Sequence, residues 1–435
     1  MIFSGSNNIL QLKKSRKLLQ RAKLLIPALS QTLSKAPYSY VEGTYPTYLS
    51  RGKGCYVYDV DNNRYIDYVL ALGPIILGYN YPRVDRAIKN QLKKGISFSI
   101  PHELEVEVSE KIKSIIPGTE MVRFSKTGSD AGTAAVRAAR AYTKRDKIAY
   151  CGSGGVWHDW FTVITSRNAG IPKVLKKMIK KFEYNNIESL KILFENWSDE
   201  IATVYIEPTV LEKPKKNFLQ DVKKLAKKNG SVLIFDEVIT GFRLANGGAQ
   251  EFFNIQSDLV VLGKGIANGM PLGAITGKTE FMEPFNEIFY STSYGGETLS
   301  LAAASAVIDE IKQKPVVKHC WKIGKYLSNE FNKLSNEVGV NAELYGFPIR
   351  SVFIFRDNVG KPSNLIKSLF YQDTIKHGIL FGPGAAMICF SHTEKEIEKT
   401  LKISEKSLRK VKKAIDTKTI KKSLKGQVMK TVMTF

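Results

Sequence analysis

Two short apolar runs, residues 232–235 and 259–262, place the strongest constraint on how this chain can fold. Turn-forming residues flank both runs, a pattern typical of strands that are buried on both faces of a parallel sheet. A charged residue closes each run: Asp236 follows the first directly, and Lys264 follows the second after Gly263. Because ligands of open α/β sheets bind at the carboxyl ends of the strands, we expect both side chains to point into one crevice.

An acid and a lysine at two strand ends form the pair that pyridoxal phosphate (PLP) requires. This cofactor is held as a Schiff base on a lysine, and a carboxylate keeps its ring nitrogen protonated. A crowded pocket lowers the pKa of the lysine amine, which is the direction that imine formation needs. Gly263 and Gly265, on either side of Lys264, leave room for a flat ring. Taken alone, the lysine could lie in an exposed glycine turn and Asp236 could cap a strand.

In this setting the chain resembles the class III aminotransferases, a family of fold type I PLP enzymes. The resemblance rests on Phe-Asp-Glu-Val-Ile-Thr-Gly-Phe-Arg at residues 235–243 and on Gly-Lys-Gly-Ile-Ala-Asn-Gly-Met-Pro-Leu-Gly at residues 263–273. It covers nearly the whole chain and is nearest to the branch that contains glutamate-1-semialdehyde 2,1-aminomutase. The resemblance implies that Lys264 is the Schiff-base lysine, that Asp236 holds the ring nitrogen, and that Val238 packs on one ring face.

The resemblance also implies the architecture. We expect an α/β protein with the fold type I PLP-dependent transferase fold, in which helices flank a central, mostly parallel sheet. A smaller α+β domain is built from both termini. The expected divisions are residues 1–80, an N-terminal helix and hairpin that join the small domain, residues 81–314, the large PLP-binding domain, and residues 315–435, the C-terminal small domain with a basic tail.

A candidate phosphate site lies between a predicted strand at residues 121–124 and a predicted helix at residues 133–142. A strand, a glycine turn and a helix N-terminus can cradle a phosphate with backbone N–H groups. The family carries Ser-Gly-Ser/Thr-Glu-Ala at this place, and residues 127–131, Thr-Gly-Ser-Asp-Ala, match it. The resemblance therefore implies that Gly128 and Ser129 bind the cofactor phosphate.

Two further positions correspond to family landmarks. Glu207 follows a predicted strand at residues 202–206 and lies near the cofactor in relatives. The loop at residues 291–296 resembles one that crosses the dimer interface in relatives, where a hydroxyl reaches the partner's cofactor phosphate. Ser293 stands where relatives usually have threonine, so the resemblance implies a homodimer with shared active sites. Without that resemblance the segment is a serine-rich surface loop.

The chain departs from the family after a predicted strand at residues 147–150. Relatives place an aromatic residue here, usually within Tyr-His-Gly, to stack on the PLP ring. In this chain Ser153-Gly154 replace Tyr-His, and Val156 is inserted before Trp157. Either Trp157 stacks on the ring, or it belongs to the buried core and the ring has no aromatic cover. His158 has two interpretations as well: it orients the ring, or it only satisfies its loop.

Composition and charge argue against several other classes of protein. The formal net charge is +24, and lysines are spread along the whole chain. Without interleaved aromatics or a known binding module, this charge indicates a solvated surface that attracts polyanions weakly, and no specific nucleic-acid partner. No apolar run approaches the ~20 residues of a membrane helix, and no signal peptide is recognisable. The four cysteines lack metal-ligand spacing. We expect a cytoplasmic protein without a metal or a membrane partner.

Three functions are compatible with these residues. The leading hypothesis is a PLP-dependent aminotransferase that moves an amino group from an amine or amino acid donor to a carbonyl acceptor, with Lys264 and Asp236 as catalytic residues. The alternative is intramolecular transfer by an aminomutase. Against it, Pro46–Ser50 stand where that enzyme's substrate-carboxylate arginine is expected, and Gly384 stands in place of a family glutamate. A remote alternative is a non-catalytic basic binding protein, although the retained lysine and aspartate argue against it.

Overall fold

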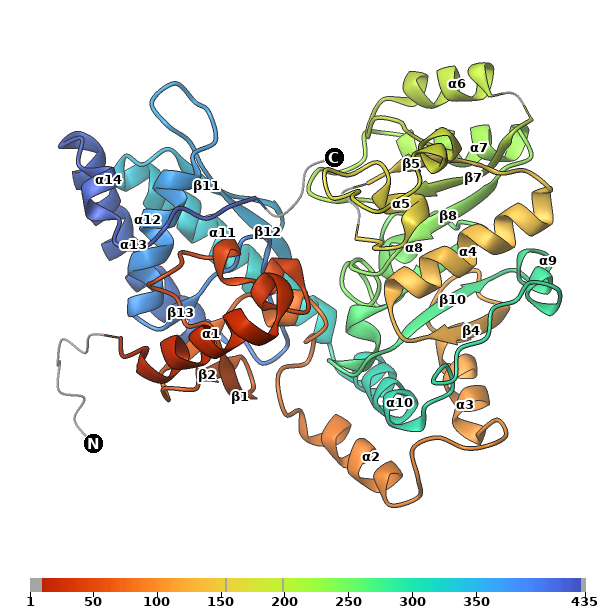
Figure 1. Cartoon of the computed structure of the whole chain (residues 1–435), viewed down its shortest axis with the longest axis horizontal. Coiled ribbons are helices and arrows are strands. Elements are labelled where there is room, and N and C mark those ends of the chain that lie inside the picture. Colours follow the sequence, from red (N-terminus) through yellow and green to blue (C-terminus); the bar gives the residue numbers. More distant parts are fainter. Residues whose placement is uncertain (1–9, 153–154, 198, 432–435) are drawn as a thin grey trace. The chain divides into compact units, whose positions relative to one another are not determined.

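Two compact units make up the structure, a computed structural model that describes residues 10–152, 155–197 and 199–431 (Figure 1). The first unit joins residues 10–72, 78–80 and 320–431, so it draws on both ends of the chain. The second unit holds residues 73–77 and 81–319. The borders expected after residues 80 and 314 stay predictions of how the chain divides into folding domains.

A seven-stranded sheet with the order β4-β10-β9-β8-β7-β5-β6 forms the centre of the second unit. Its strands are β4 (Met121–Ser125), β5 (Lys147–Cys151), β6 (Ile179–Lys181), β7 (Ile201–Ile206), β8 (Val232–Asp236), β9 (Leu259–Leu262) and β10 (Gly273–Gly277). The five strands from β9 to β6 pair in parallel, whereas β10 is antiparallel to both β9 and β4. The expected mostly parallel sheet is therefore present, with one reversed strand.

Both faces of this sheet are covered by apolar cores, which explains why its central strands are apolar throughout. On one face, Ile234 of β8 shares a core with α4 (Gly128–Thr143) and α9 (Thr279–Met282). On the other face, Leu233 and Phe235 share a core with α6 (Ile187–Asn196) and α7 (Phe218–Lys228). Because side chains alternate along a strand, Asp236 projects to the α4 side, as Ile234 does.

The second unit contains several other helices. They are α2 (Pro82–Leu92), α3 (Glu103–Lys113), α5 (Asp159–Thr162), α8 (Gly248–Phe252) and α10 (Thr298–Gln313), with 3-10 turns at Lys173–Met178, Lys264–Ala267 and Glu283–Asn286. α11 (Val316–Val338) runs from this unit into the first. Ion pairs from Arg83 of α2 to Asp309 and Glu310 of α10 join two of these helices.

Two small sheets form the first unit. One has the order β1-β2-β3-β13, with β1 (Leu49–Lys53), β2 (Tyr56–Asp59), β3 (Arg64–Asp67) and β13 (Ile379–Leu380), and the other has the order β11-β12-β14, with β11 (Ala342–Phe347), β12 (Arg350–Phe355) and β14 (Ala386–Met387). The predicted hairpin is confirmed by β2 and β3, and the parallel pairing of β13 with β3 joins the two ends of the chain.

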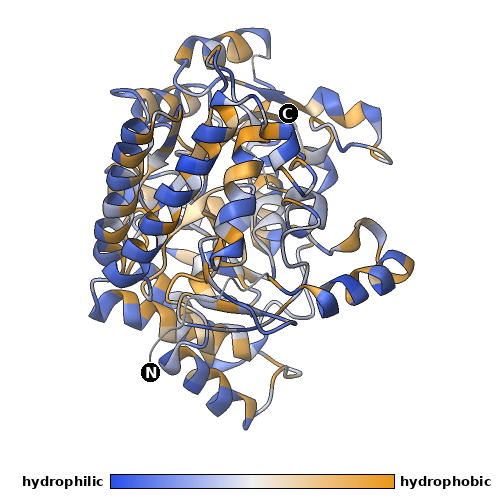
Figure 2. Cartoon of the chain, turned by 90° about the vertical axis from the view of Figure 1, so that its left-hand side faces the viewer, coloured by the Kyte–Doolittle hydropathy of each residue, from blue (hydrophilic) through white to orange (hydrophobic). Residues whose placement is uncertain are grey.

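Helices cover these small sheets and present hydrophilic stripes on their outer sides (Figure 2). They are α1 (Lys13–Leu25), α12 (Asn364–Lys376), α13 (Glu394–Asp416) and α14 (Ile420–Ser423), together with 3-10 turns at Pro27–Leu29, Leu33–Lys35, Pro37–Ser39 and Leu70–Leu72. Thr393 and Glu396 form a capping box at the start of α13, and Ile397, Leu401 and Leu408 line its buried side. Spacings of four and seven residues keep these side chains on one face of a helix.

The lysine-rich tail packs on the first unit through its described part. Gln427 N donates to Glu42 O and Lys430 N donates to Tyr38 O, both at 3.0 Å. Met429 is buried. The tail therefore fastens the N-terminal segment around residues 38–42.

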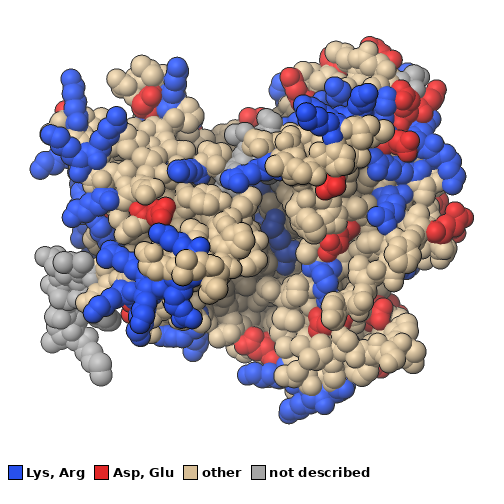
Figure 3. All heavy atoms as spheres, viewed as in Figure 1, with Lys and Arg blue, Asp and Glu red and all other residues tan. Residues whose placement is uncertain are grey.

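Lysine and arginine side chains are spread over the face shown in Figure 3, with acidic side chains interspersed among them. Across the residues that the structure describes, no helix is both long and apolar enough to cross a membrane. Within the same residues, no three His, Cys, Asp or Glu side chains gather closely enough to hold a metal ion.

Candidate active site

Adjacent parallel strands bring Asp236 and Lys264 to the same edge of the large sheet. Asp236 is the register partner of Val261 across β8 and β9, and Lys264 comes three residues after Val261. Lys264 is half-buried at the start of the 3-10 turn that follows β9. Its charge acts to lower the pKa of Asp236, so the two side chains interact electrostatically. The structure thus brings together the pair that the sequence singled out.

Asp236 is held by two hydrogen bonds. Tyr205 Oη donates to Oδ2 at 2.8 Å, and Val238 N donates to Oδ1 at 3.1 Å. Burial raises the pKa of Asp236 to about 6, and the nearby Glu207 adds to the rise, whereas these hydrogen bonds and Lys264 act in the opposite direction. The carboxylate is therefore ionised at neutral pH at a desolvation cost, which a cationic ligand would relieve.

Lys264 itself has a left-handed backbone, with φ of +42°. This region is uncommon for a residue with a side chain, and such strained residues cluster at functional sites. Its two glycine neighbours have different surroundings. A Cβ on Gly263 would lie 3.3 Å from Val238 Cγ1 and 3.5 Å from Gly128 Cα, whereas a Cβ on Gly265 would have no neighbour nearer than 3.7 Å. Gly263 thus allows Val238 and Gly128 to lie close to the turn that carries Lys264, whereas Gly265 is less tightly surrounded.

The predicted phosphate ligands Gly128 and Ser129 lie in the first turn of α4. We expected this helix to begin near residue 133, but it begins at Gly128. The reason is a capping box: Asp130 N donates to Thr127 Oγ1 at 3.1 Å, and Thr127 N donates to Asp130 Oδ2 at 2.9 Å. The first N–H groups of a helix have no partner within the helix, so this turn can receive an anion.

Val238 closes the gap between the start of α4 and the strand ends. A Cβ on Gly128 would lie only 2.5 Å from Val238 Cγ2, so glycine is needed at this position. Because a Cβ on Gly263 would touch both Val238 and Gly128, these three residues lie close together and form a close-packed floor. The floor connects the candidate phosphate site with the turn that carries Lys264.

The loop at residues 155–158 touches the candidate phosphate site through Ser129. Ser129 Oγ donates to Gly155 O at 3.2 Å and accepts from Trp157 N at 3.3 Å. The Trp157 side chain is 67% exposed, so the buried-core alternative for it is wrong. Its stacking on a cofactor ring stays a prediction. Ser153-Gly154, which replace the family's Tyr-His, lie outside the described residues.

Glu207 and Ser293 have contrasting positions. Glu207 is buried at the end of β7, and its charge acts on Asp236, which places it beside the candidate site. Ser293 is exposed in the turn at residues 293–296, and its expected role toward a partner's cofactor stays a prediction. The roles of all the candidate residues as cofactor ligands remain predictions.

Sequence reasoning missed Tyr205, which donates to Asp236 from the neighbouring strand β7. Strand alternation places Tyr205 and Glu207 on one face of β7, so a period-two pattern could have indicated that Tyr205 faces the site.

The sequence also left open what the other charged residues of the 235–243 motif do. Glu237 is buried and accepts from Ala249 N and Gln250 N, and burial raises its pKa to about 7. Arg243, also buried, donates to Gly73 O, so both residues hold the surrounding loops.

Comparison with known families identifies the chain. The family described as Aminotransferase class-III matches residues 38–346. The chain belongs to the class III aminotransferases. This membership confirms the predicted family and with it the prediction of an enzyme.

Two relatives illustrate the range of this family. The 3-aminobutyryl-CoA aminotransferase of Cloacimonas acidaminovorans is 35% identical to this class III aminotransferase, over 93% of the chain and 99% of the relative. The glutamate-1-semialdehyde 2,1-aminomutase of Alkaliphilus oremlandii is 36% identical, over 92% of the chain and 100% of the relative. Relatives of both kinds, aminotransferase and aminomutase, are thus similar to the whole chain.

Solved structures confirm the predicted fold. The FumI protein of Sphingopyxis sp. MTA144, solved in its PLP internal aldimine form, superposes with a TM-score of 0.88, covering 95% of this chain and 98% of that one. Sequence identity is 24%. The class III aminotransferase therefore has the fold type I architecture that the sequence predicted.

Proposed function

We propose that this class III aminotransferase uses PLP to move an amino group from an amine or amino acid donor to a carbonyl acceptor. The observation that carries the proposal is the meeting of three parts at one sheet edge: Lys264, Asp236 and the start of α4. The Gly128–Val238–Gly263 floor joins these parts within one unit.

The residues fit PLP by their chemistry. The first turn of α4 suits a phosphate dianion, because helix N-termini attract anions. Asp236 is a half-buried carboxylate with a raised pKa, and such a group suits the protonated nitrogen of a pyridine ring. Lys264 supplies the amine that an aldehyde needs, from a half-buried position beside that carboxylate.

Each residue then has a defined task. When bound, PLP supplies an electron sink for the carbon that loses a proton. Lys264 holds the cofactor covalently and, as a free amine, moves a proton at the substrate carbon through Nζ. Asp236 keeps the ring nitrogen charged through a charge-assisted hydrogen bond, and Tyr205 and Val238 N orient its carboxylate. Val238 also excludes water from one side of the ring.

Two features favour the aminotransferase over the aminomutase. Pro46–Ser50, where the carboxylate-binding arginine is expected, contribute Pro46, Thr47, Tyr48 and Leu49 to a mostly apolar cavity of about 520 Å³ in the first unit. Gly384, in place of the family glutamate, is exposed, with open space where a side chain would be. Both substitutions remove groups that would hold a substrate with a free carboxylate, so a carbonyl acceptor without one is favoured.

The test combines two measurements: the lysine to which the cofactor is attached, and the substrates that the protein accepts. After borohydride reduction, mass analysis should find the cofactor on Lys264, and Lys264→Ala should lose the visible absorbance of bound PLP. Lys278→Ala is the matched control, because Lys278 also directly follows a strand, β10, but at the opposite edge of the sheet. Cofactor on any other lysine would refute the assignment.

The substrate screen should include the compounds that the relatives' names suggest, 3-aminobutyryl-CoA and glutamate 1-semialdehyde, with a panel of amines and carbonyl compounds. Amino transfer between two different molecules would support the proposal. Isomerisation of glutamate 1-semialdehyde without exchange with added amines would support the aminomutase instead.

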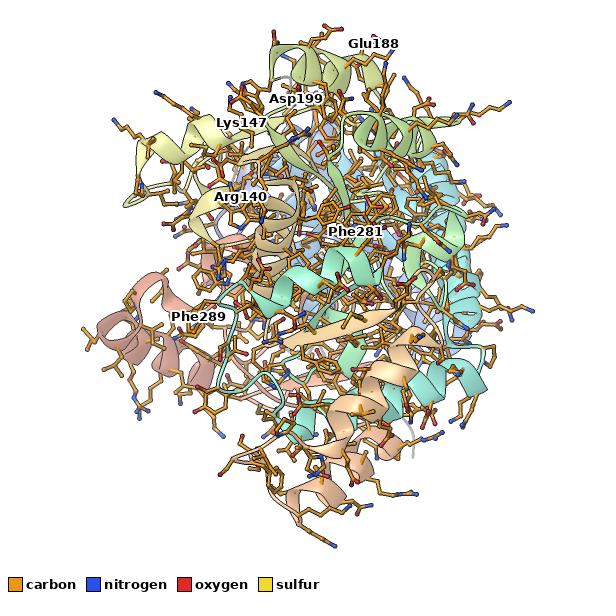
Figure 4. The ribbon with its side chains drawn as sticks, turned by 90° about the vertical axis from the view of Figure 1, so that its right-hand side faces the viewer. Arg140, Lys147, Glu188, Asp199, Phe281 and Phe289 are labelled. Carbon is orange, nitrogen blue, oxygen red and sulfur yellow. The ribbon has the colours of Figure 1, made fainter. Side chains whose placement is uncertain are left out.

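A homodimer with shared sites is the second part of the proposal. Two segments of the second unit, residues 100–106 and 289–294, carry large apolar side chains that are mostly exposed, namely Ile100, Val106, Phe289 (labelled in Figure 4) and Tyr294. The segments that carry them meet, because residues from both line a cavity of about 360 Å³ and Thr298 N donates to Ile96 O. Exposed apolar surface of this kind is typical of a protein interface.

A cytoplasmic location completes the proposal. All four cysteines are buried and none of them forms a disulfide, and burial raises the pKa of the Cys151 thiol to about 12. Chains that keep several cysteines unpaired are typical of reducing compartments. Detection of the protein in a cytosolic fraction, rather than in an oxidising compartment, would support this location.

A further inference from the structure

His158 lies between the Trp157 loop and the start of α4, and its ring contacts both. Its Nδ1 lies 2.6 Å from Thr133 Oγ1, and its Nε2 lies 3.4 Å from Asp130 Oδ1. Trp160 Nε1 donates to the same Thr133 oxygen at 2.8 Å. The His158 and Asp130 side chains are 24% and 23% exposed, so water competes little for these contacts.

The hydrogen-bonding capacity of these partners shows how the ring can satisfy both of them. An ionised Asp130 can only accept, so Nε2 must carry a hydrogen to bond it. The Thr133 oxygen already accepts from Trp160, so its own proton is available for Nδ1. With a hydrogen on Nε2, the ring can therefore satisfy both partners: Thr133 Oγ1 can donate to Nδ1, and Nε2 can donate to Asp130.

Through Asp130 this bond reaches the cap of α4. The other oxygen of Asp130 accepts from Thr127 N and completes the capping box that starts the helix at Gly128. Burial acts to raise the pKa of Asp130, but hydrogen bonds from His158 and Thr127 outweigh it and leave the pKa below its usual value. His158 thus stabilises the carboxylate that holds the first turn in place.

The same ring also supports the neighbouring tryptophan. The Trp157 and His158 rings meet edge to face, with centroids 4.2 Å apart and planes at 87°. Trp157 N donates to Ser129 Oγ, which lies in the first turn of α4. One histidine therefore contacts both the helix turn that would receive a phosphate and the aromatic ring that would cover a cofactor.

We propose that His158 is a positioning residue for the cofactor: it fixes the first turn of α4 and the Trp157 ring relative to each other, in place of the Tyr-His pair that this chain lacks. This inference rests on the proposed PLP function. The sequence left open whether His158 orients the ring or only satisfies its loop. If His158 orients the site, its loss should change the PLP affinity; if it only satisfies its loop, the affinity should stay the same.

Equilibrium dialysis of PLP against the full-length cofactor-free protein tests the proposal. We expect His158→Ala to raise the Kd for PLP about tenfold, the scale set by the loss of one or two part-buried hydrogen bonds. His158→Asn, which can keep the contact to Thr133, and His158→Gln, which can keep the contact to Asp130, should each recover part of the affinity. Thr133→Val should act in the same direction as His158→Ala.

His377→Ala is the matched control. His377 is the C-cap residue of α12 in the first unit, where its Nδ1 is 3.8 Å from Asp373 Oδ2, so it also pairs with an acid. Its loss should leave the Kd within about twofold of the wild-type value, because it belongs to the first unit and the candidate site to the second.

Three results would decide against the proposal. One is a His158→Ala protein that binds PLP as tightly as the wild type. Another is an equal rise of the Kd in the alanine, asparagine and glutamine variants, accompanied by a lower Tm of the cofactor-free protein. That result would mean that His158 contributes only to folding. The third is unchanged quenching of tryptophan fluorescence by PLP in His158→Ala, since Trp157 would then not depend on it. Failure of the wild-type protein to bind PLP would instead refute the proposed function.

Discussion

At the scale of single residues, the site carries electrostatic strain that a ligand would relieve. Burial raises the pKa of Asp236 to about 6, whereas an aspartate in an unfolded chain titrates near 3.9. A group with a raised folded-state pKa favours folding at low pH, and that contribution disappears as the pH rises from the unfolded pKa through the folded one. Ionised Asp236 therefore destabilises the cofactor-free protein above about pH 6.

Asp236→Asn should make the cofactor-free protein more stable at pH 8, by about 1–3 kcal/mol. An asparagine can still accept from Val238 N and donate to Tyr205 Oη, so the local contacts survive. The gain should vanish near pH 4, where both proteins are neutral at this position. Denaturant unfolding at the two pH values measures it. Activity should fall sharply in the same variant, and wild-type turnover would rule out the catalytic role.

Trp157→Ala should weaken PLP binding several-fold without lowering Tm. A stacked aromatic pair contributes about 0.5–1.5 kcal/mol beyond its buried area, which is at most about tenfold in affinity. The side chain is 67% exposed, so the folded protein loses little when it is removed. Trp157→Phe keeps a ring and should bind nearly as the wild type does. Unchanged affinity in both variants would show that no stacking occurs.

At the scale of elements, the start of α4 is fitted to the end of β8. Gly128 opens the helix, and Val238 follows the strand by two residues. No side chain fits on Gly128, because its Cβ would meet both methyl groups of Val238, at 2.5 and 2.9 Å. A glycine in the first helical turn is thus explained by packing as well as by the anion site.

Gly128→Ala should destabilise the protein by about 1–3 kcal/mol, the usual cost of overpacking, and weaken PLP binding. Val238→Ala removes the two methyl groups that the new Cβ would meet. The double variant Gly128→Ala/Val238→Ala should therefore be more stable than the sum of the two single changes, which a double-mutant cycle measures. Additive effects would mean that the two residues do not contact each other in the folded protein.

At the scale of the whole molecule, the exposed apolar residues indicate assembly. Phe289 is 85% exposed and Ile100 is 78% exposed, in a chain whose surface is otherwise rich in lysine. Side chains of this size contribute most of the binding energy at interfaces when they become buried. A partner that covers residues 96–106 and 289–296 would also bring Ser293 to the interface.

Mixing two inactive variants should restore activity if the sites are shared. Lys264→Ala lacks the lysine proposed to hold the cofactor, and Ser293→Trp blocks the loop that would reach the partner. A hybrid dimer contains one site free of both changes, so activity should recover to about a quarter of the wild-type level, as random assembly of hybrid dimers predicts. Sedimentation should give a dimer, and a fully active monomer would refute the proposal.

Local sequence patterns were enough for much of the fold and for the central pair. The apolar runs at residues 232–235 and 259–262 form β8 and β9. Asp236 was found because it directly follows the first apolar run, and Lys264 because it follows the second run after one glycine. The earlier start of α4 was missed, although Thr127 and Asp130 are spaced as a capping box requires.

The amino-acid sequence by itself determined which segments form strands and helices, because alternation and helical spacing involve residues close together in the chain. Only the tertiary structure decided which distant residues meet. Tyr205 reaches Asp236 across 31 positions, His158 reaches Thr133 across 25, and Met429 N reaches Ser368 Oγ across 61. No local pattern encodes such contacts, since they arise when packed elements bring their side chains together. The exposure of Trp157 was decided in the same way, because burial depends on every segment that packs nearby.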